Sequence, residues 1–263
     1  MNAEMETAAA LLRSETPIRI LERLDEAAAT KYELRDELDC ARTTVDRNLD
    51  RLEADGWVVE SENRYVITTG GEIVLEQAST FLETVGVASR LQPVLRWLPR
   101  EVLDIDLKHF ADAEVTVPTD GQPIAMVDKH TQAVKRASDA RLVLPVVSPQ
   151  GLQAQYENHS LEDLSVEVIA TPTVTDILQS APEFADAITE MQEAGALDIY
   201  VTEQSLPCYL GLLDETVQIG VDNDGQPRAL LESDDEAVRA WAAEKIESYR
   251  ADAVPLDAWR ERE

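Results

Sequence analysis

Apolar residues recur every three or four positions in three segments near the start of the chain, which predicts three short helices, and two short β-like segments come after them. The helices are expected over residues 16–26, 30–39 and 42–55, and the strands over 57–61 and 64–68. Thr16 is placed to cap the first helix, and Thr30 and Glu33 have capping-box spacing at the second. Gly56 can end the third in a left-handed conformation. This order of elements predicts a winged helix-turn-helix over residues 1–70.

A longer helical pattern comes next, over residues 73–98, with a kink expected at Pro93. Its apolar residues recur at alternating steps of four and three, the spacing of a coiled-coil seam. The seam consists of Val74, Ala78, Phe81, Val85 and Ala88. Because half-sites on DNA are commonly paired, we expect residues 71–98 to join two copies of the chain. Packing of the same stripe within one chain is the alternative.

The remaining part of the chain, residues 99–263, alternates Val- and Leu-rich strands with helical segments. The strands are expected over 113–117, 140–148, 165–172 and 198–203, and the helices between them over 121–139, 149–163 and 175–195. Further strands are expected over 208–215 and 216–233, and a helix over 234–251. This alternation predicts an α/β domain with a mainly parallel sheet covered on both faces. The fold class expected for the whole chain is α/β.

The sequence LRDELDCARTTVDRNLDRLEADGWV, residues 34–58, resembles the helix-turn-helix of bacterial and archaeal winged-helix regulators. Their pattern R-[ST]-T-V-x-R-x-L-x-x-L-x-x-x-G is matched by Arg42, Thr43, Thr44, Val45, Arg47, Leu49, Leu52 and Gly56. The chain departs from the family at Ala41, where a capping Ser is common, and this costs about 1 kcal/mol. Thr43 or Thr44 is expected to take over part of that role.

The same helix predicts a DNA-contacting surface, because its apolar stripe leaves the polar residues outward. Arginine binds guanine bidentately, Asn pairs with adenine, and Thr contacts a thymine methyl or a phosphate. The expected contacts are Lys31, Arg42, Thr43, Thr44, Arg47, Asn48, Arg51 and Arg64, with Arg51 and Arg64 on phosphate. The alternative is a solvated face on which Arg47 and Arg51 pair only with neighbouring aspartates.

The sequence DETVQIGVDNDGQPRALLESDDEAVRAWA, residues 214–242, resembles the effector-like domain of an archaeal regulator family named for control of methanogenesis and filament formation. This family is abundant in salt-loving archaea. The resemblance implies a phospholipase D-like fold. The H-x-K-x4-D motif of that superfold's phosphodiesterases is missing, since none of His109, His130 and His159 begins it. The resemblance therefore implies ligand binding without hydrolysis, and the chain is not expected to be an enzyme.

Polar residues stand directly after the predicted parallel strands, where ligands bind in open α/β sheets. The expected ligand-binding residues are Ser148, Gln150, Thr171, Thr173, Thr202 and Glu203. Their hydroxyl, amide and carboxylate groups suit a small polar molecule. The alternative is that the Ser and Thr residues only cap the next helices.

The charge composition of the chain indicates the kind of solution in which it works. The 263 residues include 52 Asp and Glu but 23 Lys and Arg, which gives a net charge of −29. The excess is spread along the chain and indicates a salt-loaded cytoplasm, where charges are screened. The charge is therefore no evidence against a DNA partner. Glu4 and Glu6 do not fit a signal peptide, no apolar run suits a membrane, and no cofactor motif or metal-ligand spacing occurs.

Together these features predict a sequence-specific, DNA-binding transcriptional regulator that forms a homodimer. Its second domain is expected to sense a small polar effector or to mediate assembly. The alternative is an adaptor of the transcription machinery whose α/β domain binds proteins and no ligand. A polar crevice at the strand ends would favour the sensor, and a flat apolar patch there would favour the adaptor.

Overall fold

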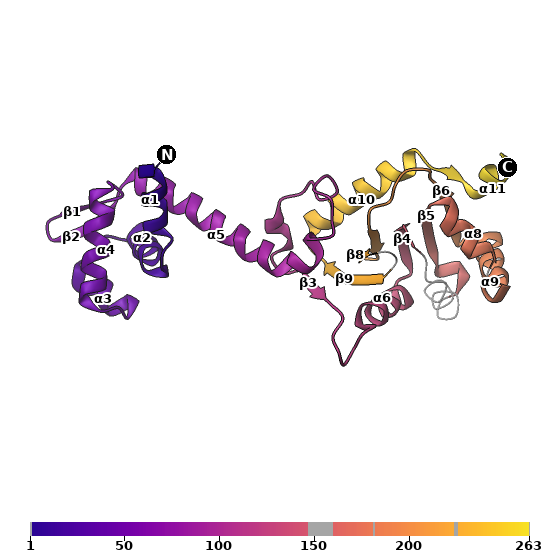
Figure 1. Ribbon diagram of the computed structural model, residues 1–263, viewed down its shortest axis with the longest axis horizontal. Coiled ribbons are helices and arrows are strands. Elements are labelled where there is room, and N and C mark those ends of the chain that lie inside the picture. The colour runs from indigo at the N-terminus through magenta and orange to yellow at the C-terminus, as the bar shows by residue number, and fades with distance from the viewer. Residues whose placement is uncertain (1, 147–159, 181, 224–225, 263) are drawn as a thin grey trace. The chain divides into compact units, whose positions relative to one another are not determined.

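The computed structural model describes residues 2–146, 160–180, 182–223 and 226–262, which form two compact units (Figure 1). The units are Met1–Val85 and Gly86–Glu263. The boundary falls inside one continuous helix, α5 (Thr69–Leu95), which runs past Pro93. The first half of α5 packs into the core of the first unit through Leu75 and Ala78, and its second half belongs to the core of the second unit.

The first unit is mostly helical and ends in a small hairpin. Its elements before α5 are α1 (Asn2–Leu11), α2 (Glu15–Glu26), α3 (Lys31–Leu38), α4 (Arg42–Ala54), β1 (Val58–Ser61) and β2 (Arg64–Ile67). All but α1 were expected from the sequence. β1 and β2 pair antiparallel through the turn at Glu62 and Asn63, both with positive φ.

Two of the three capping signals expected from the sequence are present in the structure. The Thr30 hydroxyl accepts a hydrogen bond from the Glu33 N–H at 3.2 Å, and the Glu33 carboxylate accepts one from the Thr30 N–H at 2.7 Å. Gly56 has the expected left-handed conformation, with φ +78°. The cap expected at Thr16 was wrong, because α2 begins at Glu15 and the extended residue before it is Ser14.

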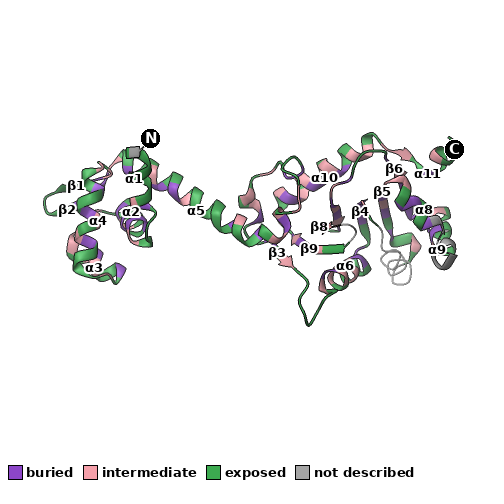
Figure 2. Cartoon of the chain, in the orientation of Figure 1, coloured by how far each residue is buried: buried purple, intermediate pink, exposed green. Residues whose placement is uncertain are grey.

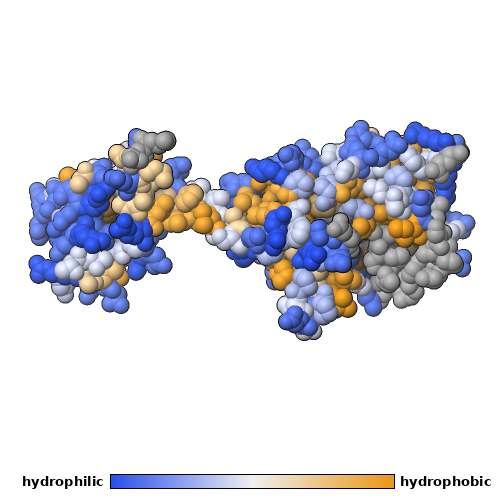
Figure 3. All heavy atoms as spheres, in the orientation of Figure 1, coloured by the Kyte–Doolittle hydropathy of each residue, from blue (hydrophilic) through white to orange (hydrophobic). Residues whose placement is uncertain are grey.

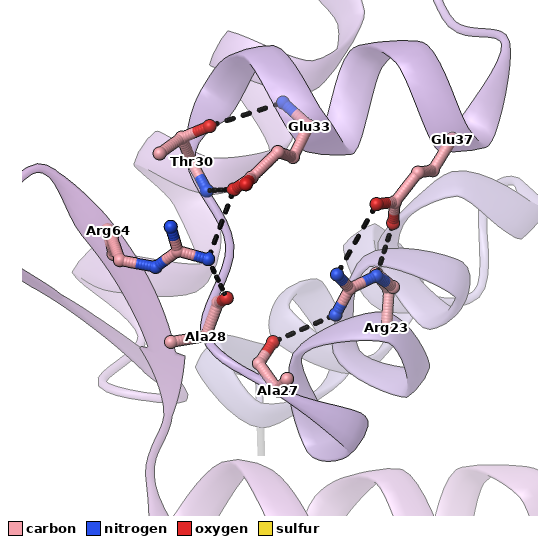
Figure 4. A network of polar contacts seen from close by, with 7 residues as sticks. All are labelled: Arg23, Ala27, Ala28, Thr30, Glu33, Glu37 and Arg64. Carbon is pink, nitrogen blue, oxygen red and sulfur yellow. Dashed lines mark hydrogen bonds and ion pairs between the residues drawn. The ribbon is translucent and has the colours of Figure 1, made fainter.

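The core of the first unit collects the apolar faces of α2, α3 and α4 and the inner side of the hairpin (Figure 2). Polar contacts fix the same elements from outside (Figure 4). Arg23 of α2 pairs with Glu37 of α3 and donates to the Ala27 carbonyl at 2.9 Å. Arg64 of β2 pairs with Glu33 at 3.2 Å. The unit therefore holds α3 and the hairpin in a fixed relation to α4.

The second unit is built on one large sheet. Its helices are η1 (Leu107–Phe110), α6 (Ala125–Arg136), η2 (Leu161–Asp163), α8 (Pro172–Ser180), α9 (Pro182–Glu193), α10 (Glu236–Ala251) and α11 (Leu256–Arg260). Its strands are β3 (Glu114–Thr116), β4 (Asp139–Leu144), β5 (Ser165–Ala170), β6 (Leu197–Val201), β7 (Tyr209–Leu213), β8 (Thr216–Asn223), β9 (Gln226–Ser233) and β10 (Val254–Pro255). The strand order is β10-β6-β5-β4-β7-β8-β9-β3.

The sheet is mixed, so the prediction of a mainly parallel sheet was wrong. Within the described residues, β4 pairs parallel with β5 and β5 with β6, and the other pairs are antiparallel. The reason is the length of the connections. Parallel neighbours need a crossover of about a dozen residues or more, but Asp214-Glu215 alone separates β7 from β8. The strand predicted over 113–117 is an antiparallel edge strand, β3.

Apolar layers cover both faces of the sheet, as predicted. One core lies between the sheet and α6, α8 and α9, and the other between the sheet and α10, the end of α5 and η1. Alternate residues of β4 enter the two cores: Leu142 and Leu144 face the first, and Val143 the second. The helix expected over 175–195 is split into α8 and α9, and the one expected over 149–163 lies largely outside the described residues.

Candidate nucleic-acid interface

Helix α4 buries one face and exposes the other. Val45, Leu49 and Leu52 are at most 2% exposed and lie in the core of the first unit. The opposite face therefore carries the polar residues of the motif. Ala41 is the residue before α4, and no side-chain hydrogen bond caps the helix there. In the described part of the chain neither Thr43 nor Thr44 supplies the missing cap, contrary to expectation. The Thr44 N–H instead donates to the Ala41 carbonyl at 2.9 Å.

The charged residues of α4 are only partly paired. Arg42 contacts Asp46 at 3.5 Å with its side chain 77% exposed, and Arg51 contacts Asp55 at 2.9 Å. Exposed pairs of this kind contribute at most about 1 kcal/mol, so a phosphate can replace the carboxylate. Arg47 is exposed and has no ion-pair partner among the described residues. The solvated-face alternative thus accounts for the ion pair of Arg51 but not for Arg47.

Helix α1 lies beside this face and forms a groove with it. The groove has a volume of about 810 Å³. It is lined by Glu6, Ala9, Ala10, Arg13 and Ser14 from α1 and the segment after it, and by Thr43, Thr44, Arg47, Asn48 and Arg51 from α4. Five of the predicted contact residues are therefore gathered in one concave surface. Asn48 is held there by a hydrogen bond from its Nδ2 to the Thr44 carbonyl at 2.8 Å.

The other predicted contact residues lie outside the groove lining. The Lys31 Nζ lies 5.5 Å from the centre of the Tyr65 ring, and its hydrogen bond to the Tyr65 hydroxyl raises the pKa of Lys31. Arg64 pairs with Glu33 and donates to the Ala28 carbonyl, so its guanidinium also braces the unit (Figure 4). Arg42 is the most open of these side chains.

Sequence reasoning missed the part of the groove that α1 contributes. The run Ala8-Ala9-Ala10 favours a helix by propensity, but it has no cap signal and no strong apolar stripe. Arg13 stands in the segment between α1 and α2 and had no motif to mark it. Its position beside Arg47 and Arg51 becomes visible only in the folded unit.

The predicted seam of α5 is packed within the chain at its start and exposed in its middle. Val74 packs against the core of the first unit and Ala78 lies in it, while Ala88 is half-buried. Phe81 is 54% exposed and Val85 43% exposed, and their neighbour Leu82 is also 43% exposed. Hydrophobic side chains accordingly gather at the surface of α5 (Figure 3). The alternative of intramolecular packing therefore holds for the start of the seam and leaves its middle uncovered.

The strand-end site predicted in the second unit is partly described. Ser148 and Gln150 lie outside the described residues. Thr171 and Thr202 come directly after the neighbouring parallel strands β5 and β6, and the Thr202 N–H donates to the Ala170 carbonyl at 2.9 Å. Thr202 is buried, and its hydroxyl accepts the Gln204 N–H at 3.1 Å. Thr173 and Glu203 are exposed.

A partly buried polar cluster joins α6 to the sheet. The Nδ1 of His130 lies 2.8 Å from the Gln218 Oε1, and the Gln218 Nε2 donates to Glu232 at 2.9 Å. Glu232 in turn pairs with Lys129. Burial lowers the pKa of His130 and so favours the neutral imidazole. The Tyr209 ring stands edge-on to this imidazole, with 4.8 Å between ring centres.

Cys208 is buried in the core, and burial raises the pKa of its thiol to about 12, which favours a packing role. Within the described ranges there is no group of His, Cys, Asp and Glu side chains suited to a metal ion. Among the described helices, none is long and apolar enough to cross a membrane.

Two family models match the sequence. Residues 5–90 match the HVO_A0261 N-terminal domain, and residues 123–252 match the middle domain of the methanogenesis regulatory protein FilR1. The first match contains α4 and the whole groove lining, and the second contains the parallel strands. No curated protein matches the chain.

Solved structures resemble the chain distantly. The match to TrmBL2, an archaeal chromatin protein described as having a novel mode of DNA binding, has 14% identity and a TM-score of 0.41, and covers 94% of this chain and 97% of that one. Nuc from Salmonella typhimurium, a phospholipase D family member, has 12% identity and a TM-score of 0.42, covering 55% and 98%. NucT from Helicobacter pylori has 9% identity and a TM-score of 0.41, with the same coverage. None of these similarities is close enough to assign a function.

Proposed function

Because the chain belongs to the regulator family of the methanogenesis regulatory protein FilR1, with an HVO_A0261 N-terminal domain, we propose that it is a sequence-specific, DNA-binding transcriptional regulator. The first unit acts as a winged helix-turn-helix, in which α3 and α4 form the motif and β1–β2 the wing. One observation carries this proposal: α4 buries Val45, Leu49 and Leu52 and turns Thr43 and Arg47 outward.

In this proposal α4 enters the major groove with its first turns against the base edges. Arg47 is the side chain best placed to bind a guanine, since no carboxylate in the described part of the chain pairs with it. Asn48 can bind an adenine once it gives up its bond to the Thr44 carbonyl. Arg42 and Arg51 exchange their aspartate partners for phosphates.

The test is a comparison of specific and random DNA. Arg47→Ala is expected to weaken binding to the cognate site by about 1–3 kcal/mol and to random DNA much less, because a base contact is lost. The cognate site comes from genome-wide mapping of bound fragments. Arg19→Ala, which removes an exposed arginine of α2 that is not part of the groove lining, is the matched control and should bind as the wild type does. Equal losses for Arg47→Ala on both DNAs would reduce Arg47 to a phosphate contact.

The regulator is further proposed to act as a homodimer through the exposed part of α5. Phe81, Leu82 and Val85 lie within five consecutive residues and expose apolar surface that one chain leaves uncovered. A second copy with the same stripe can cover it, as in a coiled coil. Two α4 helices would then contact two half-sites of a palindromic DNA sequence.

The second unit is proposed to supply the regulatory input rather than an enzymatic reaction. Its family is regulatory, and the sequence has no H-x-K-x4-D motif on a phospholipase D-like fold. Thr173 and Glu203 remain as exposed polar groups near the ends of β5 and β6. A small polar effector bound there would change the affinity for DNA. Titration of candidate effectors during DNA binding, with Glu203→Gln as the variant, tests this role.

A further inference from the structure

The groove between α1 and α4 concentrates positive charge in a strongly acidic chain. Its charged lining residues are Arg13, Arg47 and Arg51 against Glu6, a local balance of 3 − 1 = +2. The whole chain has a net charge of −29. Neither Arg13 nor Arg47 has an ion-pair partner among the described residues. Arg13, on the α1 wall, is thus available to a phosphate, while Arg47 on the α4 wall keeps its proposed contact with a base.

The wall that carries Arg13 is attached to the rest of the unit. Leu11, at the end of α1, is 6% exposed and belongs to the same core as Leu49 of α4. Ala9 and Ala10 are small, so they leave room in the groove, and Ser14 adds a hydroxyl group. The α1 wall is therefore a fixed part of the surface around α4.

From this geometry we infer that the groove holds the sugar-phosphate backbone of one DNA strand, with Arg13 as a phosphate contact outside the helix-turn-helix. The inference rests on the proposed function. A helix inserted in the major groove has phosphates along both flanks, and α1 lies along one flank of α4. Arginine is suited to this role because it binds phosphate bidentately. The Glu6 carboxylate lines the same groove and would repel the phosphates of the DNA backbone.

The first experiment measures binding of the full chain to a short random-sequence duplex as KCl is varied. Arg13→Ala is expected to weaken binding about three- to tenfold and to make the slope of log K against log salt less negative by about one, since one phosphate contact releases about one cation. Arg19→Ala, the same change on the exposed side of α2, should leave affinity and slope unchanged.

The second experiment looks for a gain, which misfolding cannot produce. Glu6→Gln removes the carboxylate from the groove and is expected to tighten binding to the same duplex. Glu22→Gln makes the same change of net charge on α2, outside the groove, and should tighten it much less. Equal effects at residues 6 and 22 would mean that only the overall charge matters and would overturn the inference.

The inference and the proposed function fail in different ways. If Arg47→Ala weakens binding to the cognate site but Arg13→Ala behaves as Arg19→Ala does, the chain reads DNA through α4 and the groove holds no backbone. If neither Arg47→Ala nor Arg13→Ala changes binding to any DNA, the proposed function itself is wrong. Weaker DNA binding by Arg13→Ala together with tighter DNA binding by Glu6→Gln supports both the inference and the proposed function.

Discussion

At the scale of single residues, the partly buried polar cluster of the second unit contains a polar side chain that the hydrophobic pattern of the sequence does not place inside the protein. Gln218 is completely buried on β8, although its strand alternates apolar and polar residues. The hydroxyl of Tyr209 is buried too, and among the described residues it has no hydrogen-bond partner. It lies over Gly211, where a Cβ would come within 2.1 Å of the hydroxyl oxygen. The cost of such a buried hydroxyl can be tested by removing one atom.

Tyr209→Phe is expected to leave the second unit as stable as the wild type or to stabilise it by about 1 kcal/mol. The physical reason is that an unpaired buried hydroxyl loses its bonds to water and gains none. Denaturant unfolding at constant high KCl measures the change. Tyr65→Phe is the matched control with the opposite sign, because the Tyr65 hydroxyl donates to Glu60 at 3.0 Å. Clear destabilisation by Tyr209→Phe would show that its hydroxyl has a bonding partner.

His130 gives the second unit a predicted pH dependence. Burial lowers the pKa of His130 in the folded chain below its value in the unfolded chain, about 6.5. As pH falls through 6.5, the unfolded chain therefore takes up a proton before the folded chain does, and stability decreases. One proton accounts for at most about 1.4 kcal/mol per pH unit. Between about pH 7.5 and 5.5, the free energy of unfolding should fall less steeply for His130→Gln than for the wild type. Parallel plots of this free energy against pH for the two proteins would contradict the prediction.

At the scale of elements, the sequence predicted what depends on neighbours in the chain. The capping box of Thr30 and Glu33 and the left-handed Gly56 were correct because they act within a single turn. Helix α1 was missed because its place is fixed by Leu11 in a core assembled from other segments. The parallel sheet was overstated because the strand-helix alternation of residues 113–203 was taken to describe the whole sheet, although short connections such as Asp214-Glu215 force antiparallel pairing. Five contact residues of the groove were predicted, but Arg13 was not.

Helix α5 carries the prediction that belongs to this scale. Phe81→Glu is expected to turn the proposed dimer into a monomer and to weaken binding to palindromic DNA, because the new charge would be buried in both copies. Sedimentation at micromolar concentration measures the change. Thr80→Glu adds the same charge at an exposed position on another face of the same helix and should leave the dimer intact. A wild-type chain that sediments as a monomer would end the proposal.

At the scale of the whole molecule, the excess of negative charge is present in both parts of the sequence. Residues 1–70 hold 9 basic and 16 acidic residues, which gives 9 − 16 = −7, and residues 71–263 hold 14 and 36, which gives 14 − 36 = −22. In dilute buffer this surface repels both itself and DNA. At about 1 M salt the Debye length is about 3 Å, so most of that repulsion is screened while close contacts remain. The chain is therefore expected to unfold well below about 0.5 M KCl.

Binding to DNA should then depend weakly on salt between about 0.5 and 2 M KCl, because two terms oppose each other. Release of cations by the few arginines around α4 weakens binding as salt rises. Screening of the acidic surface strengthens it, and cations can bridge carboxylates such as Asp46 and Asp50 to phosphate. A shallow or inverted slope of log K against log salt is the expected result of a titration with cognate DNA. A slope of about −4 or steeper would show that ordinary phosphate electrostatics dominate, and the acidic surface would then have no part in how this chain binds DNA.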